Sequence, residues 1–94
     1  MVTKQVFEIM EIVLQKDLCL VRGRAYDDVQ VGNKVFIEGQ QTTDGRKYHD
    51  FEIVGILTYQ TEMQFLGGGY TGQLTLRGSN LELLRHATHL LNLG

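Results

Sequence analysis

The sequence contains no proline, no tryptophan and only one cysteine, Cys19, among its 94 residues. A single cysteine excludes an internal disulfide and is typical of proteins in a reducing compartment. No segment has the roughly 20 consecutive apolar residues of a membrane-spanning helix. Met1–Gln5 also lacks the long apolar run that follows the basic start of a signal peptide. These features predict a cytoplasmic protein that does not contact a membrane.

The chain also lacks a strong excess of charge of either sign. Nine Lys and Arg residues against eleven Asp and Glu residues give a formal net charge of −2, and the basic residues are scattered along the sequence. Nucleic-acid-binding proteins usually have a basic stripe, because neutralising phosphates supplies most of their affinity. The composition therefore argues against non-specific binding to nucleic acid, and leaves open only a local basic patch.

Eleven glycines separate short segments that are rich in β-branched and other apolar residues. We predict strands over residues 6–14, 18–26, 29–31, 34–38, 51–59 and 70–77. Asp44-Gly45 is the clearest signal for a hairpin turn, and residues 60–69 are predicted to form a loop. Short strands with frequent turns favour a closed β-barrel, because an open sheet of this size would leave unpaired edges.

The hydrophobic periodicity changes after Gly78. Ser79 and Glu82 have the spacing of a capping box, which predicts that a helix starts near Asn80. At about 100° per residue, six apolar side chains share one half of this helix: Leu81, Leu83, Leu84, Ala87, Leu90 and Leu91. We therefore predict one all-β domain over residues 1–94, with a closed, six-stranded or nearly six-stranded barrel over 1–78 and a C-terminal helix over 79–93.

The order of the glycine-marked segments resembles the second domain of elongation factor Tu, initiation factors and related translational GTPases. The matching segments are residues 22–24, 29–37, 53–56, 68–72 and 74–78. This resemblance implies a translation-factor domain 2-like β-barrel that stands alone, without the GTPase domain. The sequence has no Gly-x-x-x-x-Gly-Lys-Ser/Thr loop, so we expect no GTP binding of the P-loop kind.

In elongation factor Tu this domain helps to hold the 3′ end of aminoacyl-tRNA. Glu11 matches one acid of the family's pair in the first strand, but Ile12 stands in place of the second. Gln60 and Tyr70 stand near the positions of a family arginine and asparagine. The resemblance therefore implies the architecture much more than this binding activity.

No set of residues has the pattern of a catalytic site. Gly67–Gly72 satisfies Gly-x-Gly-x-x-Gly, but a dinucleotide site needs that motif to open a helix, and a strand is predicted to follow it. We therefore expect no cofactor. Glu82, His86 and His89 lie on the polar face of the predicted helix and are weak candidates for a metal site; a structural or surface role is the alternative. The sequence predicts a protein that is not an enzyme.

Two sets of residues are candidates for binding a partner. Arg22, Arg24 and Arg77 would attract phosphates or carboxylates if they lay together, or would pair with nearby acids. Apolar residues of the loop and helix are the candidate protein interface: Met63, Phe65, Leu66, Leu81, Leu83 and Leu90. We expect a non-enzymatic binding or assembly module that contacts another protein or itself. An RNA- or ribosome-associated accessory factor using the arginines is the first alternative, and a small metal-dependent protein the second.

Overall fold

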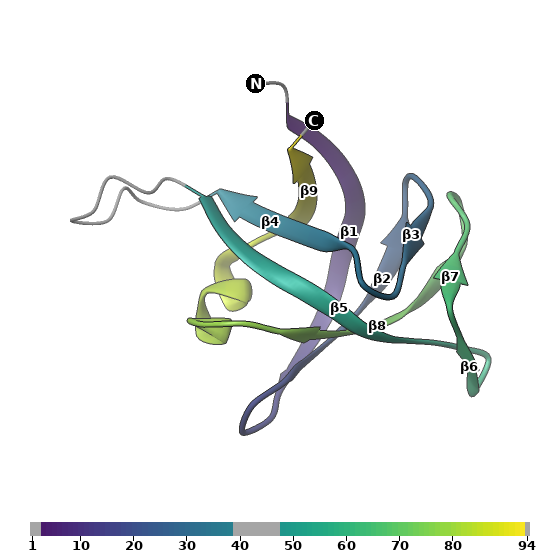
Figure 1. The fold of residues 1–94 in the computed structure, drawn as a ribbon, viewed down its shortest axis with the longest axis horizontal. Coiled ribbons are helices and arrows are strands. Elements are labelled where there is room, and N and C mark those ends of the chain that lie inside the picture. Colours follow the sequence, from purple (N-terminus) through teal and green to yellow (C-terminus); the bar gives the residue numbers. More distant parts are fainter. Residues whose placement is uncertain (1–2, 39–47, 94) are drawn as a thin grey trace.

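The computed structural model describes residues 3–38 and 48–93, and these form strands with one short 3-10 helix (Figure 1). The predicted turn at Asp44-Gly45 lies outside the described residues. The elements are β1 (Thr3–Leu14), β2 (Cys19–Ala25), β3 (Val29–Gln30), β4 (Lys34–Glu38), β5 (Tyr48–Thr58), β6 (Thr61–Met63), β7 (Phe65–Leu66), β8 (Thr71–Arg77), η1 (Leu81–His86) and β9 (His89–Leu93).

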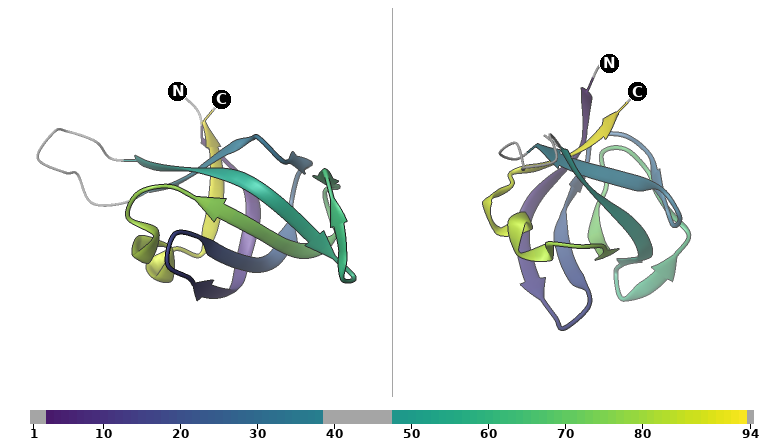
Figure 2. Two further views of the ribbon diagram at one scale, coloured as in Figure 1. Left: turned by 60° about the horizontal axis from the view of Figure 1, so that its bottom comes forward. Right: turned by 60° about the vertical axis from the view of Figure 1, so that its left-hand side comes forward.

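Six antiparallel strands close into a barrel. The order in the main sheet is β4-β9-β1-β2-β8-β5-β6, and β4 also pairs with β5, which completes the ring. β6 extends the sheet beyond the ring, and β3 and β7 form a separate two-stranded sheet (Figure 2). The prediction of an all-β, closed six-stranded barrel is confirmed, although one of its six strands, β9, was predicted to be helical.

The barrel forms because its strands alternate inward apolar and outward polar residues. In β2, Cys19, Val21 and Ala25 are buried while Arg22 and Arg24 face solvent. Burying an aliphatic or aromatic side chain contributes roughly 1.5–3 kcal/mol. The side chains with almost no exposed surface that fill the barrel include Phe7, Val21, Phe51, Ile53, Ile56, Leu74, Leu76, Leu84 and Leu90.

The predicted C-terminal helix over residues 79–93 is wrong. Only Leu81–His86 is helical, as a 3-10 helix, and Asn80 at its N-cap has φ 59° and makes no capping hydrogen bond through its side chain. Among the described residues no helix is long and apolar enough to cross a membrane. The chain continues as strand β9, whose Leu90 is fully buried opposite Phe7.

The physical reason for this error is that tertiary pairing overrides local helix signals. β9 lies between β1 and β4, and pairs with both of them. A helix at this position would leave the edges of β1 and β4 without backbone partners. The apolar spacing that suggests one helix therefore arises from two different elements, a 3-10 turn and a strand.

The predicted loop over residues 60–69 is also partly wrong, because it contains β6 and β7. β5 turns directly into β6, with Thr58 opposite Thr61. The two turn residues, Tyr59 and Gln60, have φ of 50° and 63°. Such turns usually contain Asn or Gly, so the sequence gives no signal for this one.

Gly23 allows the closest approach between two strands of the barrel. It faces inward on β2, opposite a bulge in β1 between Ile9 and Glu11. A Cβ atom at this position would overlap the carbonyl oxygen of Glu8 and lie 2.8 Å from Cε1 of Phe7. Only glycine therefore permits the bulge and the packing of Phe7 beneath it.

We expect Gly23→Ala to lower the free energy of unfolding by about 3 kcal/mol, because the backbone of Glu8 cannot move without breaking the β1–β2 pairing. Urea denaturation followed by circular dichroism measures this change. Gly55→Ala is the matched control, since its Cβ would meet Thr75 at an ordinary 3.5 Å. Equal stabilities of the two variants would contradict the packing described here.

Candidate functional site

The three predicted arginines do not form one cluster. Arg22 lies opposite Gln73 on β8, and Arg77 lies four residues further along that strand, at a distance of about 13 Å. Nη1 of Arg22 is 3.6 Å from Oε2 of Glu11, and Nη2 of Arg77 is 2.8 Å from Oε1 of Glu52. These pairs are solvent-exposed, so each contributes little to stability.

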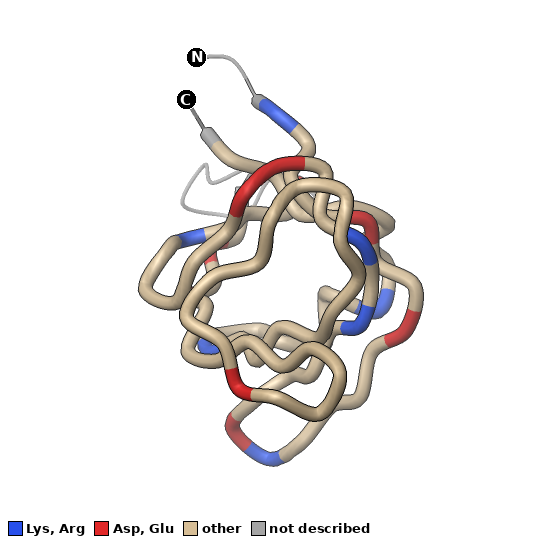
Figure 3. The backbone as a smooth tube through the Cα atoms, turned by 90° about the vertical axis from the view of Figure 1, so that its right-hand side faces the viewer, with Lys and Arg blue, Asp and Glu red and all other residues tan. Residues whose placement is uncertain are grey.

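Positions of Lys and Arg are interspersed with positions of Asp and Glu along the backbone around the barrel (Figure 3). Asp27, a possible partner for the arginines, instead pairs with Nζ of Lys4 at 2.5 Å. Hydrogen bonds from Lys4 and from the backbone N–H of Asp28, together with the charge of Lys4, lower the pKa of the Asp27 carboxyl. The described surface therefore offers no continuous basic stripe to a nucleic acid.

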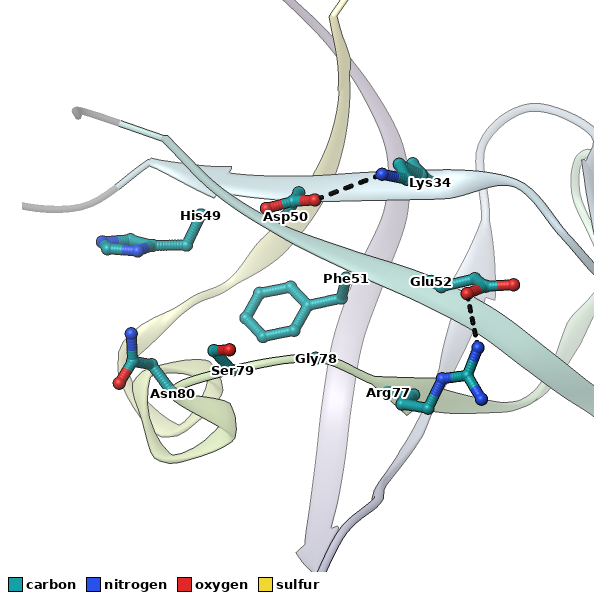
Figure 4. A pocket seen from close by; sticks show the side chains of 9 residues that line it. All are labelled: Lys34, His49, Asp50, Phe51, Glu52, Arg77, Gly78, Ser79 and Asn80. Carbon is teal, nitrogen blue, oxygen red and sulfur yellow. Dashed lines mark hydrogen bonds and ion pairs between the residues drawn. The ribbon is translucent and has the colours of Figure 1, made fainter.

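A polar groove of about 280 Å³ runs over β4, β5 and the end of β8 (Figure 4). Oδ2 of Asp50 is 3.6 Å from Nζ of Lys34, and Oε1 of Glu52 accepts a hydrogen bond from Nη2 of Arg77. Figure 4 shows the ring of His49 directed away from the Asp50 carboxylate, with Ser79 and Asn80 farther along the groove. The charges of this groove are paired with one another, and His49 and Asp50 do not form an acid–base pair.

The weak metal candidates lie on two different elements. Glu82 and His86 belong to η1, and His89 belongs to β9. The ring of His89 contacts Tyr26 and Thr88, with 3.3 Å between its Nε2 and the Tyr26 hydroxyl and 3.0 Å between its Nδ1 and Oγ1 of Thr88. Within residues 3–38 and 48–93, no three His, Cys, Asp or Glu side chains gather at a possible metal site.

Tyr26 lies against His89, with 5.7 Å between the ring centroids. Desolvation raises the pKa of its phenol, the nearby Glu8 raises it further, and the charge of Arg24 offsets part of this effect. Glu8 lies directly opposite Arg24, on the neighbouring strand β1.

Cys19 is fully buried in the core, opposite Leu76. Burial raises the pKa of its thiol, and the nearby Arg85 offsets only part of this effect. Because the thiolate is the reactive form, Cys19 is a packing residue and not a nucleophile in the folded protein.

We expect Cys19 to react with Ellman's reagent at least about a hundredfold more slowly in the folded protein than in urea, since labelling requires opening of the barrel. The rate of absorbance increase at constant pH measures this difference. The Cys19→Ser variant tests that no other group contributes to the absorbance increase. A fast reaction of the folded protein would show that the thiol is accessible.

Large apolar side chains concentrate on one segment of the surface. Of the eight large hydrophobic side chains that are exposed in the described residues, Leu57, Tyr59, Met63, Phe65 and Tyr70 lie between residues 57 and 70. The other three are Met10, Val13 and Tyr26. We call the five clustered residues the apolar end; they belong to the β6–β7 end of the molecule (Figure 1).

The structure divides the predicted interface residues into two groups. Met63 and Phe65 are exposed at the apolar end, as the prediction of a protein interface requires. Leu66, Leu81 and Leu90 belong to the core, and Leu83 packs partly against it. Sequence reasoning did not identify Leu57, Tyr59 and Tyr70, because their exposure depends on the position of the turn between β5 and β6.

Phe65 and Tyr70 flank the backbone of Gly67. A Cβ atom at Gly67 would lie 3.2 Å from the ring of Tyr70 and 3.8 Å from that of Phe65. The N–H of Gly68 donates to Oδ1 of Asp28 at 2.9 Å, which ties this segment to the turn between β2 and β3. The glycine-rich segment then leads into strand β8, so it lacks the helix that a dinucleotide site requires.

Tyr59 forms one wall of a groove of about 360 Å³ on the outer face of the barrel. Met10 and Leu57 supply the other apolar walls, and the remaining lining residues are Arg22, Gly23, Thr58, Gln60, Thr71, Gly72 and Gln73. Tyr59 is 89% exposed to solvent, and its backbone is in the left-handed region. This conformation costs about 1–2 kcal/mol in a residue other than glycine. A strained turn that displays an aromatic ring marks a candidate binding site.

We expect the double substitution Tyr59→Asn with Gln60→Gly to raise the free energy of unfolding by about 1 kcal/mol, because Asn-Gly suits a turn with two positive φ angles. Urea denaturation measures the gain. Glu62→Ala, at an exposed position of the adjacent strand, is a control that leaves the turn and its hydrogen bonds unchanged. A destabilised double variant would mean that contacts of Tyr59 or Gln60 outweigh the strain.

Comparison with models of known families, with curated proteins and with solved structures found no match for this chain. The closed barrel is therefore established by its own strand pairing. The function must be argued from the surface of this molecule.

Proposed function

We propose that this chain is a non-enzymatic binding or assembly module that acts through protein–protein contact at the apolar end. The observation that carries the proposal is the concentration of exposed large apolar side chains between residues 57 and 70. Single exposed apolar residues are common on any protein, whereas a group of them marks an interaction site. Three of the five side chains are aromatic, and aromatic residues are enriched in protein interfaces.

The strand pairing supports a likeness to the second domain of translational GTPases. In the β2–β8 pair, Gly23 of the Arg-Gly-Arg segment lies directly opposite Gly72, which ends the Gly-x-x-x-Gly segment. Ile53 and Ile56 of a third segment lie opposite Leu76 and Leu74 of a fourth. Segments that the resemblance treats as one pattern are therefore neighbours in space. We infer that the described residues form a barrel of this kind, in a protein of the cytoplasm.

The distribution of charge supports a binding role over a catalytic one. Lys4, Lys34 and Arg77 each pair with a carboxylate, and the paired side chains are exposed to water. Active sites activate their acids and bases largely by desolvation, which exposed ion pairs do not provide. The carboxylates beside Arg22 and Arg77 also weigh against an extended RNA-binding surface.

Photo-crosslinking tests the proposal. With benzoylphenylalanine in place of Tyr59, we expect discrete protein adducts after irradiation in the cells in which the gene occurs. The same group in place of Lys16, an exposed residue between β1 and β2, is the matched control. An adduct of twice the chain's mass would identify a homodimer, and sedimentation equilibrium would confirm it.

The adducts at position 59 should weaken when Phe65 and Tyr70 are both replaced by serine, because the partner loses apolar contact area. The substitutions are on the surface, so circular dichroism should show an unchanged fold. Identical adduct patterns at positions 59 and 16, together with a monomer in sedimentation, would overturn the proposal.

A further inference from the structure

Arg24 faces outward from β2, where it is exposed opposite Glu8 and Thr71. Among residues 3–38 and 48–93, no ion pair or side-chain hydrogen bond of its guanidinium is found, although its charge acts on the nearby phenol of Tyr26. An arginine has five N–H donors, and here they are available to a ligand.

Arg22 lies two residues from Arg24 on the same face of β2. Its closest approach to Glu11 is 3.6 Å, beyond hydrogen-bond distance, and both side chains are more than half exposed. The Cα atoms of residues i and i+2 in a strand are about 7 Å apart. The two long side chains can therefore converge on one carboxylate from both sides.

Arg22 lines the groove beside Tyr59, and Arg24 lies next to this groove, opposite its lining residue Thr71. Leu57 on β5 lies opposite Gln73 on β8, which in turn lies opposite Arg22 on β2. Two strand spacings separate Leu57 from Arg22, or about 10 Å. Three residues of a peptide in the extended polyproline II conformation span about the same distance, and residues three apart then lie on the same face of the peptide.

The polar lining of the groove suits the backbone of such a peptide. Gln60 and Gln73 carry amide groups, and Thr58 and Thr71 carry hydroxyls, within the same groove. These side chains can donate to peptide carbonyls and accept from peptide N–H groups. The surface thus combines backbone recognition, an apolar wall and a site of positive charge.

We propose that this groove binds an extended acidic segment of a partner protein. Arg22 and Arg24 hold a carboxylate of the segment, and a large apolar side chain about three residues away packs against Leu57 and Tyr59. The inference rests on the proposed function and names the chemistry of the partner. Charge complementarity decides the occupant, since arginine donors that make no hydrogen bond to a carboxylate, beside an apolar wall, match an acid that is flanked by apolar residues.

A protein segment fits the groove better than single-stranded RNA does. RNA carries a phosphate on every nucleotide, and its affinity grows with the number of phosphates that are neutralised. Glu8 and Glu11 lie on β1 directly beside the two arginines, so the four side chains together carry no net charge, which disfavours a chain of many phosphates more than a single carboxylate. One carboxylate requires only the two guanidiniums.

Fluorescence anisotropy with the full chain and two labelled peptides tests the inference. In the first peptide, blocked at both ends, leucine and glutamate alternate, so that every leucine has a glutamate three residues away. The second has glutamine in place of glutamate. We expect the glutamate peptide to bind about tenfold more tightly, because hydrogen bonds to a charged acceptor are stronger.

Arg24→Gln should lower the affinity for the glutamate peptide about tenfold and leave the affinity for the glutamine peptide unchanged. Arg85→Gln, on η1, is the matched control and should change neither affinity. Tyr59→Ser should lower the affinity for both peptides, since it removes an apolar wall of the groove. Circular dichroism of each variant establishes that it is folded.

Equal affinities for the two peptides, or no binding of either, would overturn the inference. Tighter binding of an oligouridylate of the same length would also overturn it, in favour of a nucleic-acid ligand. If the adducts at position 59 persist while the preference for glutamate is absent, the proposal of a protein–protein contact is retained and the proposal of an acidic partner is rejected. If the adducts are also absent, both proposals are rejected.

Discussion

The backbone pairing of β9 with β1 and β4 is the constraint on which the rest of the structure depends. Without β9, the ring of strands would be open between β1 and β4, and Leu90 would not reach the core beside Phe7. Each open edge would expose unpaired N–H and C=O groups. The last described residues of the chain therefore act as structural members of the barrel, so the surface that we propose for partner binding lies elsewhere.

Closure of the ring also explains why the apolar end is exposed. Once six strands satisfy one another, β6 projects beyond the ring and β3 pairs with β7 outside it. Leu66 turns inward, and its side chain meets Gly72, while Phe65 turns outward. The alternation of a strand thus fixes one residue of this pair in the core and presents its neighbour to solvent.

The sequence carries enough information to predict the strands in which small, β-branched or apolar residues alternate with polar ones. β2 and β8 are of this kind, and Gly23 could be recognised as a required glycine only once its bulged neighbour was known. The segment after Gly78 could not be predicted locally, because the spacing of Leu81, Leu84 and Leu90 suits a helix as well as a 3-10 turn followed by a strand. Long-range pairing decides between them, and one sequence does not display it.

The candidate site was harder to predict because it depends on which charged side chains already pair with another charged side chain. Arg22, Arg24 and Arg77 are chemically equivalent in the sequence, yet Arg77 has a carboxylate at 2.8 Å and Arg22 only a distant one. Arg24 differs from both, since no ion pair of its guanidinium is found among the described residues. A guanidinium of this kind and a strained, exposed tyrosine both reduce the stability of an isolated barrel, or at best add nothing to it. Arg24 lies opposite Thr71, which lines the groove beside Tyr59, and this proximity favours one explanation for the two features, namely a ligand that satisfies the charge and covers the ring.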